Sequence, residues 1–256
     1  MYHVLVTDFY KPQVLAEEKD FLIVYKPPRM HSAPQVSSTE SLYTWCVENF
    51  PEVGELKGRN KGEGGLLHRL DYETHGLMLL ARSKLGMEAL LEQQEQGKII
   101  KEYSALTGES GIALHGFPKE KPELQPGDAV KITSTFRAYG EGRKAVRPVL
   151  TGDVKKNMTE KLYITEVIES KLMSTAGLGN CLSLRLRISK GFRHQIRCHL
   201  AWLGVPILND ALYGGVAFGN GFLALRACSL AFADPATEEE RCYAIQGLRA
   251  EDLVRE

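Results

Sequence analysis

Residues 68–76, HRLDYETHG, place several ionisable side chains directly before an apolar run, LMLLA. A carboxylate such as Asp71 could serve as a nucleophile or a proton acceptor. An aspartate before a turn is more often a local hydrogen-bond acceptor. The segment therefore predicts either a catalytic carboxylate or a structural turn, set against a buried strand.

Other chemistries find less support in the sequence. One metal site would use His68, Asp71 and His75. Another would use His194 and His199, whose spacing of five does not align two ligands on one face of a helix. The GxSxG elbow of a serine hydrolase is absent. The GEGG stretch has neither the GxGxxG pattern nor the P-loop lysine, so a nucleotide cofactor is unsupported.

A second group of residues carries an excess of positive charge. The segment from Ser183 to Asn209 contains five cations and no acidic residue. These cations are Arg185, Arg187, Lys190, Arg193 and Arg197. Gly191 lets a backbone approach closely, and the N-terminus of a following helix would add partial positive charge. The segment predicts an anion or phosphate site, with a solvated basic face as the alternative.

A third group combines cations with aromatic rings. Phe136 and Tyr139 lie among four basic residues, Arg137, Arg143, Lys144 and Arg147. This combination suits nucleic acid, since phosphates take the charge and bases stack on rings. The same composition also describes many ordinary hairpins.

Composition limits the function classes. The 256 residues carry 32 basic and 32 acidic side chains, so the formal net charge is zero. Any nucleic acid or membrane must then be held by a local patch. Five scattered cysteines without a CxxC pair favour reduced thiols over disulfides or a structural zinc. The apolar runs are far below the roughly 18 residues that span a bilayer, which predicts a soluble, cytoplasmic protein.

Periodicity predicts the elements that position these residues. Buried strands are expected at 21–28 and 76–82, and strands at 101–110, 161–170, 181–189 and 222–235. Helices are expected after cap candidates Ser37, Ser38 and Thr39, between Ser83 and Gly97, and over 191–204. Residues 53–65 read as a glycine-rich loop with Lys57, Arg59 and Lys61, and residues 236–256 as an acidic, peripheral tail. Strands outnumber helices without alternating with them, which favours an α+β fold.

Three motifs in order resemble the RluA-type pseudouridine synthases. They are HRLDYETHGLMLLARS, KEYSALTG and GFRHQIRCHLAWLGVPILNDALYGG, and the likeness extends to LIVYKPPRMHSAP and FLALRACSLAFADP, over about residues 20–235. The resemblance implies an α+β fold with a mixed, mostly antiparallel sheet, flanking helices and a central active-site cleft. It also implies one catalytic domain over 1–256, with a core at about 18–235, a basic loop or hairpin insertion at about 117–160, and no N-terminal S4 domain.

The resemblance implies a reaction and roles for single residues. A uridine in RNA would be isomerised to pseudouridine without a cofactor. Asp71 matches the catalytic carboxylate, acting either as nucleophile or through a glycal intermediate. Tyr103 matches the tyrosine that stacks on the base, and Arg197 matches the arginine that pairs with the aspartate. Arg69 matches the residue that is inserted in place of the flipped base. Tyrosine provides a ring and a hydroxyl for these tasks.

The expected RNA contacts come from the same motifs and from the basic clusters. The substrate-binding residues are His68, Arg69, Thr74, Ile196, Gln195, His194, Arg193, Lys190, Arg143 and Lys144, with further phosphate contacts from Arg137 and Arg185. The chain departs from the family pattern at Pro28-Arg29, His75 and Arg226, which affects the choice of RNA. We expect a monomer that acts on ribosomal or transfer RNA, with no metal and no membrane. The rival functions are a non-catalytic RNA-binding protein or RNA-folding chaperone and, more distantly, a metal-dependent hydrolase.

Overall fold

The computed structural model describes residues 1–36, 38–58, 62–108, 114–150, 152, 158–175, 177 and 179–254. The strands are β1 (Tyr2–His3), β2 (Gln13–Glu17), β3 (Phe21–Lys26), β4 (His75–Ala81), β5 (Ile100–Thr107), β6 (Val130–Tyr139), β7 (Ala145–Val149), β8 (Tyr163–Thr175), β9 (Gly179–Ile188), β10 (Leu225–Ala233) and β11 (Glu240–Ala244). The helices are α1 (Leu42–Asn49), α2 (Pro51–Glu55), α3 (Lys84–Gln96) and α4 (Gln195–Leu203), with 3-10 turns η1 (Glu141–Arg143) and η2 (Ala250–Leu253). The few helices and the mixed, mostly antiparallel pairing confirm the predicted α+β class.

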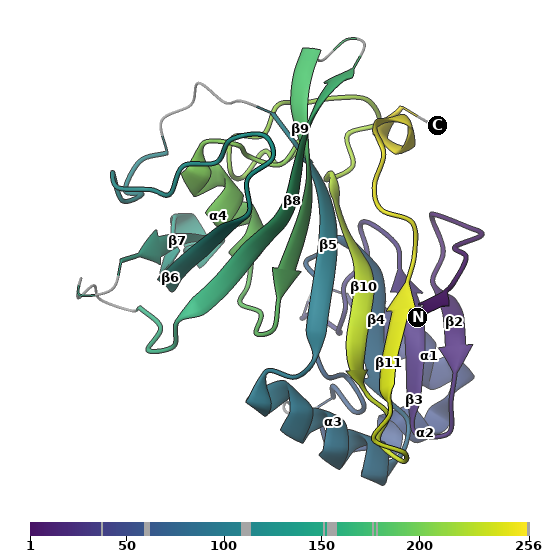
Figure 1. Cartoon of the computed structure of the whole chain (residues 1–256). Coiled ribbons are helices and arrows are strands. Elements are labelled where there is room, and N and C mark those ends of the chain that lie inside the picture. Colours follow the sequence, from purple (N-terminus) through teal and green to yellow (C-terminus); the bar gives the residue numbers. More distant parts are fainter. Residues whose placement is uncertain are drawn as a thin grey trace. The chain divides into compact units, whose positions relative to one another are not determined.

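The chain divides into two compact units, 1–102 with 226–247 and 103–225 with 248–256. In the first unit the strands pair in the order β2-β3-β4-β10-β11-β1. The pairs β4–β10 and β1–β11 are parallel and the other three are antiparallel. Figure 1 shows β3, β4, β10 and β11 side by side. Every residue of β3 and β4 is buried, as their continuous apolar sequences predict.

Helix α3 covers the core of this first unit. Ser83 caps it by accepting a hydrogen bond from the Gly86 N–H, and Gly97 ends it in the left-handed conformation, as the sequence predicts. Met87 and Leu90 on its buried face pack into the cluster formed by the strands. The helix thereby closes one face of the sheet that carries the HRLD segment.

The second unit is an antiparallel sheet in the order β9-β8-β6-β7. In β9, Leu184, Leu186 and Ile188 are buried while Arg187 is exposed, which confirms the predicted alternation. The predicted insertion at 117–160 contains the β6–β7 hairpin, turned at η1. Helix α4 packs on this unit, and its Cys198 and Ala201 join a core with Phe136, Val146 and Tyr213.

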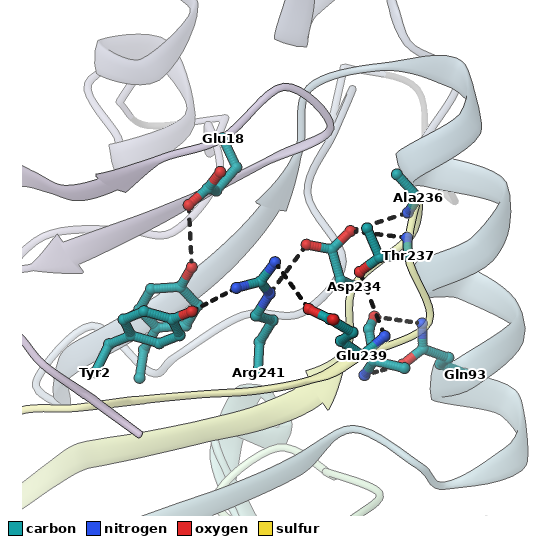
Figure 2. Close-up of polar contacts among 10 residues, drawn as sticks. Tyr2, Glu18, Gln93, Asp234, Ala236, Thr237, Glu239 and Arg241 are labelled. Carbon is teal, nitrogen blue, oxygen red and sulfur yellow. Dashed lines mark hydrogen bonds and ion pairs between the residues drawn. The ribbon is translucent and has the colours of Figure 1, made fainter.

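The prediction of a peripheral tail after residue 235 is wrong. Strand β11 pairs antiparallel with β10 and parallel with β1, and Tyr243 is buried. Figure 2 shows Arg241 between Tyr2, Asp234 and Glu239, with its Nε donating to Asp234 Oδ2 at 3.1 Å. The acidic run TEEE obscured a strand that this arginine and the stacked tyrosines fix to the N-terminal segment.

Two further expectations need correction in the first unit. Helix α1 is capped by Ser41, which accepts from the Thr44 N–H, rather than by the predicted Ser38 or Thr39. The predicted loop at 53–65 begins inside helix α2, which starts at Pro51 as a first-turn proline. Ser37, Arg59 and Lys61, named in these predictions, lie outside the described residues.

Candidate active site

Hydrogen bonds fix the turn that carries Asp71 on both sides of this residue. Ser32 Oγ donates to the Leu70 carbonyl at 2.7 Å, and the Leu70 N–H donates back to it at 2.9 Å. The Thr74 N–H donates to the Asp71 carbonyl at 3.1 Å, which closes a turn directly before β4. Asp71 itself is half-buried. The backbone of the predicted catalytic carboxylate is therefore fixed, while its side chain retains access to solvent.

A buried lysine lies beneath this turn. Lys26, the last residue of β3, is fully buried, and its Nζ donates to the carbonyls of Pro27 at 2.9 Å and Met30 at 2.7 Å. The same nitrogen lies 3.4 Å from the Tyr72 carbonyl. Burial lowers the pKa of Lys26 to about 7, although the negative charges of Asp71 and Glu73 oppose this shift. A cationic group is thus placed next to the carboxylate from within the same unit.

His68 and Arg69 play different parts in this turn. The Leu79 N–H donates to His68 Nε2 at 3.1 Å, so the ring ties the turn to β4. Burial lowers the pKa of His68 to about 3, with the charge of Lys101 as a second cause, which keeps the ring neutral. Arg69 is exposed and forms an ion pair with Glu63 at 3.2 Å. Of the two, Arg69 has the exposure that contact with RNA requires.

The departures from the family pattern at His75 and Arg226 are in contact. Arg226 Nε donates to His75 Nε2 at 3.0 Å, across the parallel pairing of β4 with β10. Burial, together with the charges of Arg226 and Lys26, holds the pKa of His75 well below its usual value. The His75 Nδ1 and the Thr74 Oγ1 are both buried and have no hydrogen-bond partner within the described part of the chain. Thr74, predicted to bind substrate, therefore has its hydroxyl inside the protein.

The other two predicted catalytic residues belong to the second unit. Tyr103 lies on β5 and is buried. Arg197 lies in α4, where its Nε and Nη2 each donate to a carboxylate oxygen of Asp210 at 2.8 Å. Both side chains of this ion pair are buried, and the Tyr213 ring lies 5.6 Å from the guanidinium carbon. A bidentate pair of this kind fixes the direction of the guanidinium.

Helix α4 gives its other motif residues structural contacts. Gln195 is buried; its Oε1 accepts from the Phe192 N–H, and its Nε2 donates to the Ile164 carbonyl at 2.9 Å. His199 contacts the hydroxyls of Ser134 and Thr165 at 2.9 and 2.8 Å. With both ring nitrogens engaged, His199 is placed to stabilise the core rather than to bind a metal. The described residues contain no group of three or more potential metal-ligating side chains.

The residues before α4 meet the β6–β7 hairpin. Arg193 Nη2 donates to the Arg143 carbonyl at 2.5 Å and lies 3.5 Å from the Ala145 carbonyl. His194 takes a left-handed conformation, φ 56°, and its Nδ1 lies 3.2 Å from the Tyr213 hydroxyl. Ile196 is buried. Two basic clusters that are about 50 residues apart in the sequence thus come together, with Arg143, Lys144, Lys190 and Arg193 exposed.

Several predicted cations have other neighbours instead. The β8–β9 register places Glu169 opposite Arg185 and Glu166 opposite Arg187, and opposite charges attract across such pairs. Of the five cations, Arg197 is held by Asp210, whereas Arg187, Lys190 and Arg193 are exposed. In the hairpin, the register places Arg137 opposite Arg147.

Lys26 and Asp210 were not among the predicted site residues. Lys26 ends the apolar strand FLIVYK, and only its full burial shows that its charge is used inside the protein. Asp210 is the first acidic residue after the cationic segment that ends at Asn209. Charge balance was thus the signal for Asp210, since a buried arginine requires a carboxylate partner.

The fold of the chain is similar to the folds of solved pseudouridylate synthases. The structure resembles that of human RNA Pseudouridylate Synthase Domain Containing 1, with TM-score 0.61, 20% identity and coverage of 93% of this chain and 85% of that one. For human RNA Pseudouridylate Synthase Domain Containing 4 the TM-score is 0.59 at 20% identity, covering 94% and 92%. At this identity, the likeness establishes the fold alone.

Sequence comparison establishes the family. A family model described as RNA pseudouridylate synthase matches residues 20–202. The "Uncharacterized RNA pseudouridine synthase YjbO" of Bacillus subtilis is 25% identical over 227 residues, which cover 88% of this chain and 69% of that protein. The "Ribosomal large subunit pseudouridine synthase D" of Haemophilus ducreyi is 26% identical over 203 residues, which cover 79% and 52%. The chain thus spans about half the length of this second relative. It belongs to the RNA pseudouridylate synthase family, a family of isomerases, as the resemblance to RluA-type enzymes predicts.

Proposed function

We propose that this protein isomerises a specific uridine in ribosomal or transfer RNA to pseudouridine, with Asp71 as the catalytic carboxylate. The observation that carries the proposal is the family match over residues 20–202, which includes the HRLD motif. The turn around Asp71 supports it, because hydrogen bonds fix its backbone and the Lys26 charge lies beside the carboxylate. A fixed, charge-balanced carboxylate is the group that the reaction needs.

The isomerisation balances without a cofactor. The bond from uracil N1 to the ribose C1′ breaks, and a bond from uracil C5 to C1′ forms. The proton on C5 is lost and N1 gains one, so no oxidant or reductant takes part. Asp71 either attacks the sugar or helps to form a glycal, and replacing its carboxylate by an amide would stop both routes.

The other roles follow from the family resemblance. Tyr103 stacks on the base and, on the glycal route, accepts the proton from C2′ of the ribose and returns it when the C5–C1′ bond forms. Arg197 stabilises the ionised aspartate. The pair with Asp210 supports the role of Arg197, because it directs the guanidinium. Arg69 fills the gap that the flipped base leaves, which requires it to leave its exposed ion pair with Glu63.

Phosphate contacts are proposed for the exposed cations of the second unit. Arg143, Lys144 and Lys190 provide the charge, and Arg193 holds the hairpin turn that presents Arg143. The other predicted substrate-binding residues are buried or half-buried: His68 and Thr74 in the first unit, and His194, Gln195 and Ile196 in the second. The described helices include none long and apolar enough to cross a membrane. A cytoplasmic location and a monomeric state remain part of the proposal.

Mapping pseudouridine in cells tests this function. RNA would be taken from cells that lack the gene and from the same cells complemented with wild type or with Asp71→Asn. Carbodiimide labelling and primer extension would then locate pseudouridines. A stop that is lost in the deletion and restored only by wild type supports the proposal. Restoration by both versions would show that Asp71 is structural, and an unchanged map would favour a non-catalytic RNA-binding protein.

Glu73→Gln provides the matched control. Glu73 is an exposed carboxylate on the same turn, and its charge also acts on Lys26. Its substitution is expected to restore the stop as wild type does. Purified Asp71→Asn is expected to bind RNA within a few fold of wild type, since the amide keeps the shape of the side chain.

A further inference from the structure

An exposed aromatic ring directly follows the predicted catalytic residue. Tyr72 is 42% exposed, and its ring lies 4.7 Å from the ring of His31, at an interplanar angle of 42°. Its hydroxyl makes no hydrogen bond within the described part of the chain. The backbone of Tyr72 is fixed nonetheless, because its carbonyl faces Lys26 Nζ. A large ring in this position covers little of the core, yet it is held next to Asp71.

A strained arginine lies on the neighbouring loop. Arg29 is exposed and has φ 56°, a left-handed conformation that costs energy for any residue except glycine. The next residue, Met30, gives its carbonyl to the same Lys26 ammonium that faces the Tyr72 carbonyl. The two loops therefore meet at one nitrogen atom. A guanidinium retained at a position that suits glycine points to a use for its charge.

We infer that Arg29, His31 and Tyr72 form a nucleotide subsite beside Asp71, in which Tyr72 stacks on a base next to the target uridine and Arg29 contacts its phosphate. This inference rests on the proposed function and names the form of RNA that the site accepts. Bases are free to stack on protein rings where RNA is single-stranded, as in loops and bulges. The His31 ring contacts the Tyr72 ring in a tilted arrangement, which limits the movement of Tyr72. The substrate is therefore an unpaired segment, and Tyr72 contributes to selecting it.

Substitution of the ring tests the stacking part. The probe is a single-stranded RNA with one uridine flanked by 2-aminopurine, whose fluorescence falls when the base stacks on a ring. Wild type and Tyr72→Phe should quench it with equal affinity, and Tyr72→Ala should bind about 5- to 100-fold more weakly. Leu85→Ala, an exposed apolar truncation on α3, is the control and should match wild type. Equal quenching by Tyr72→Ala and wild type, or none by wild type, would overturn the inference.

Arg29→Gly separates binding from folding. Glycine adopts the observed φ without strain, so the melting temperature should stay the same or rise. Binding of the same RNA should weaken, and the slope of log affinity against log salt should fall by about one. Unchanged affinity and slope would remove Arg29 from the subsite. A purely structural role for Arg29 would instead lower the melting temperature.

The subsite and the proposed function fail in different ways. Asp71→Asn should quench the probe as wild type does and yet restore no pseudouridine in cells. Quenching that depends on Tyr72, together with an unchanged pseudouridine map, would retain the subsite and reject the isomerase. On a transcript that wild type modifies, Tyr72→Ala should raise KM about 5- to 100-fold while kcat stays within about threefold, since stacking contributes to binding. A loss confined to kcat would overturn the subsite while leaving the isomerase intact.

Discussion

At the scale of single residues, the buried ammonium of Lys26 links two loops to the predicted catalytic turn. It contacts the carbonyls of Met30 and Tyr72 and lies in the field of Asp71. We expect Lys26→Met, which fills similar volume, to reduce kcat/KM by about 5- to 100-fold, because donated hydrogen bonds worth about 1–3 kcal/mol are lost. Steady-state kinetics would measure this, with urea unfolding to show that the variant is folded. Wild-type kinetics in this variant would refute the role of Lys26.

The pH dependence of activity provides a second prediction for Lys26. Its folded pKa is about 7 and its unfolded pKa is near 10.5, so the ammonium loses its proton as the pH rises through about 7. We expect kcat/KM to fall over this range in the wild type, because Asp71 loses its neighbouring positive charge. The residual kcat/KM of Lys26→Met should not fall over this pH range. If the fall persisted in the variant, it would report the titration of another group.

The pair of Arg197 with Asp210 leads to a prediction about stability. Asp210→Asn would remove the negative charge that accepts two hydrogen bonds from the buried Arg197 guanidinium, which costs about 3–5 kcal/mol in the free energy of unfolding. Asp8→Asn is the matched control, because Asp8 lies in an exposed ion pair with Lys11, where the expected change is below about 1 kcal/mol. Urea unfolding of both variants would measure the difference. Equal effects would mean that the Arg197 charge is satisfied without Asp210.

At the scale of elements, the turn of the β6–β7 hairpin presents Arg143 and Lys144 to solvent. Removing both charges by Arg143→Ala and Lys144→Ala should lower the slope of log affinity against log salt by about two, since each phosphate contact contributes about one. Lys84→Ala on α3, equally exposed, should leave the slope unchanged. Titrations with RNA at several salt concentrations would measure these slopes. An unchanged slope in the double variant would exclude the turn from the RNA surface.

Elements with a strong local signal were predictable from the sequence. Strands β3 and β4 follow from continuous apolar runs, and α3 follows from its Ser83 and Gly97 caps. Strand β11 was missed because its five residues form a strand by pairing with β1 and β10, and the local sequence does not reveal these partners. Its Tyr243 packs on Tyr2, a contact between the two ends of the chain. Non-local pairing of this kind is invisible to periodicity.

In the candidate site, too, the sequence predicts some features and only the structure shows the others. Motif order predicts Asp71, Tyr103 and Arg197 as catalytic residues through a family resemblance, whereas their burial and pairing came only from the structure. A lysine at the end of an apolar strand looks like a strand boundary, and only its contacts with three carbonyls reveal Lys26 as internal. The contact between His75 and Arg226 joins positions 151 residues apart. No local pattern would have paired them.

At the scale of the whole molecule, zero net charge makes buried titratable groups important for stability in acid. Burial lowers the pKa of His68 and of His199 to about 3 and that of His75 well below 6.5, so all three rings stay neutral when folded. Below about pH 6.5 the unfolded chain binds protons that the folded chain does not. The free energy of unfolding therefore falls as the pH falls, by up to about 1.4 kcal/mol per pH unit for each ring.

Urea unfolding at pH 7, 6 and 5 tests this prediction. Three such rings should give a slope approaching about 4.1 kcal/mol per pH unit in acid. His199→Asn retains polar atoms near Ser134 and Thr165 and should remove about a third of the slope, whatever it does to stability at pH 7. His115→Asn changes an exposed histidine and should leave the slope as in wild type. If His199→Asn kept the full slope, the His199 ring of the wild type would be charged in the folded protein. Both of its ring nitrogens would then donate to the hydroxyls of Ser134 and Thr165.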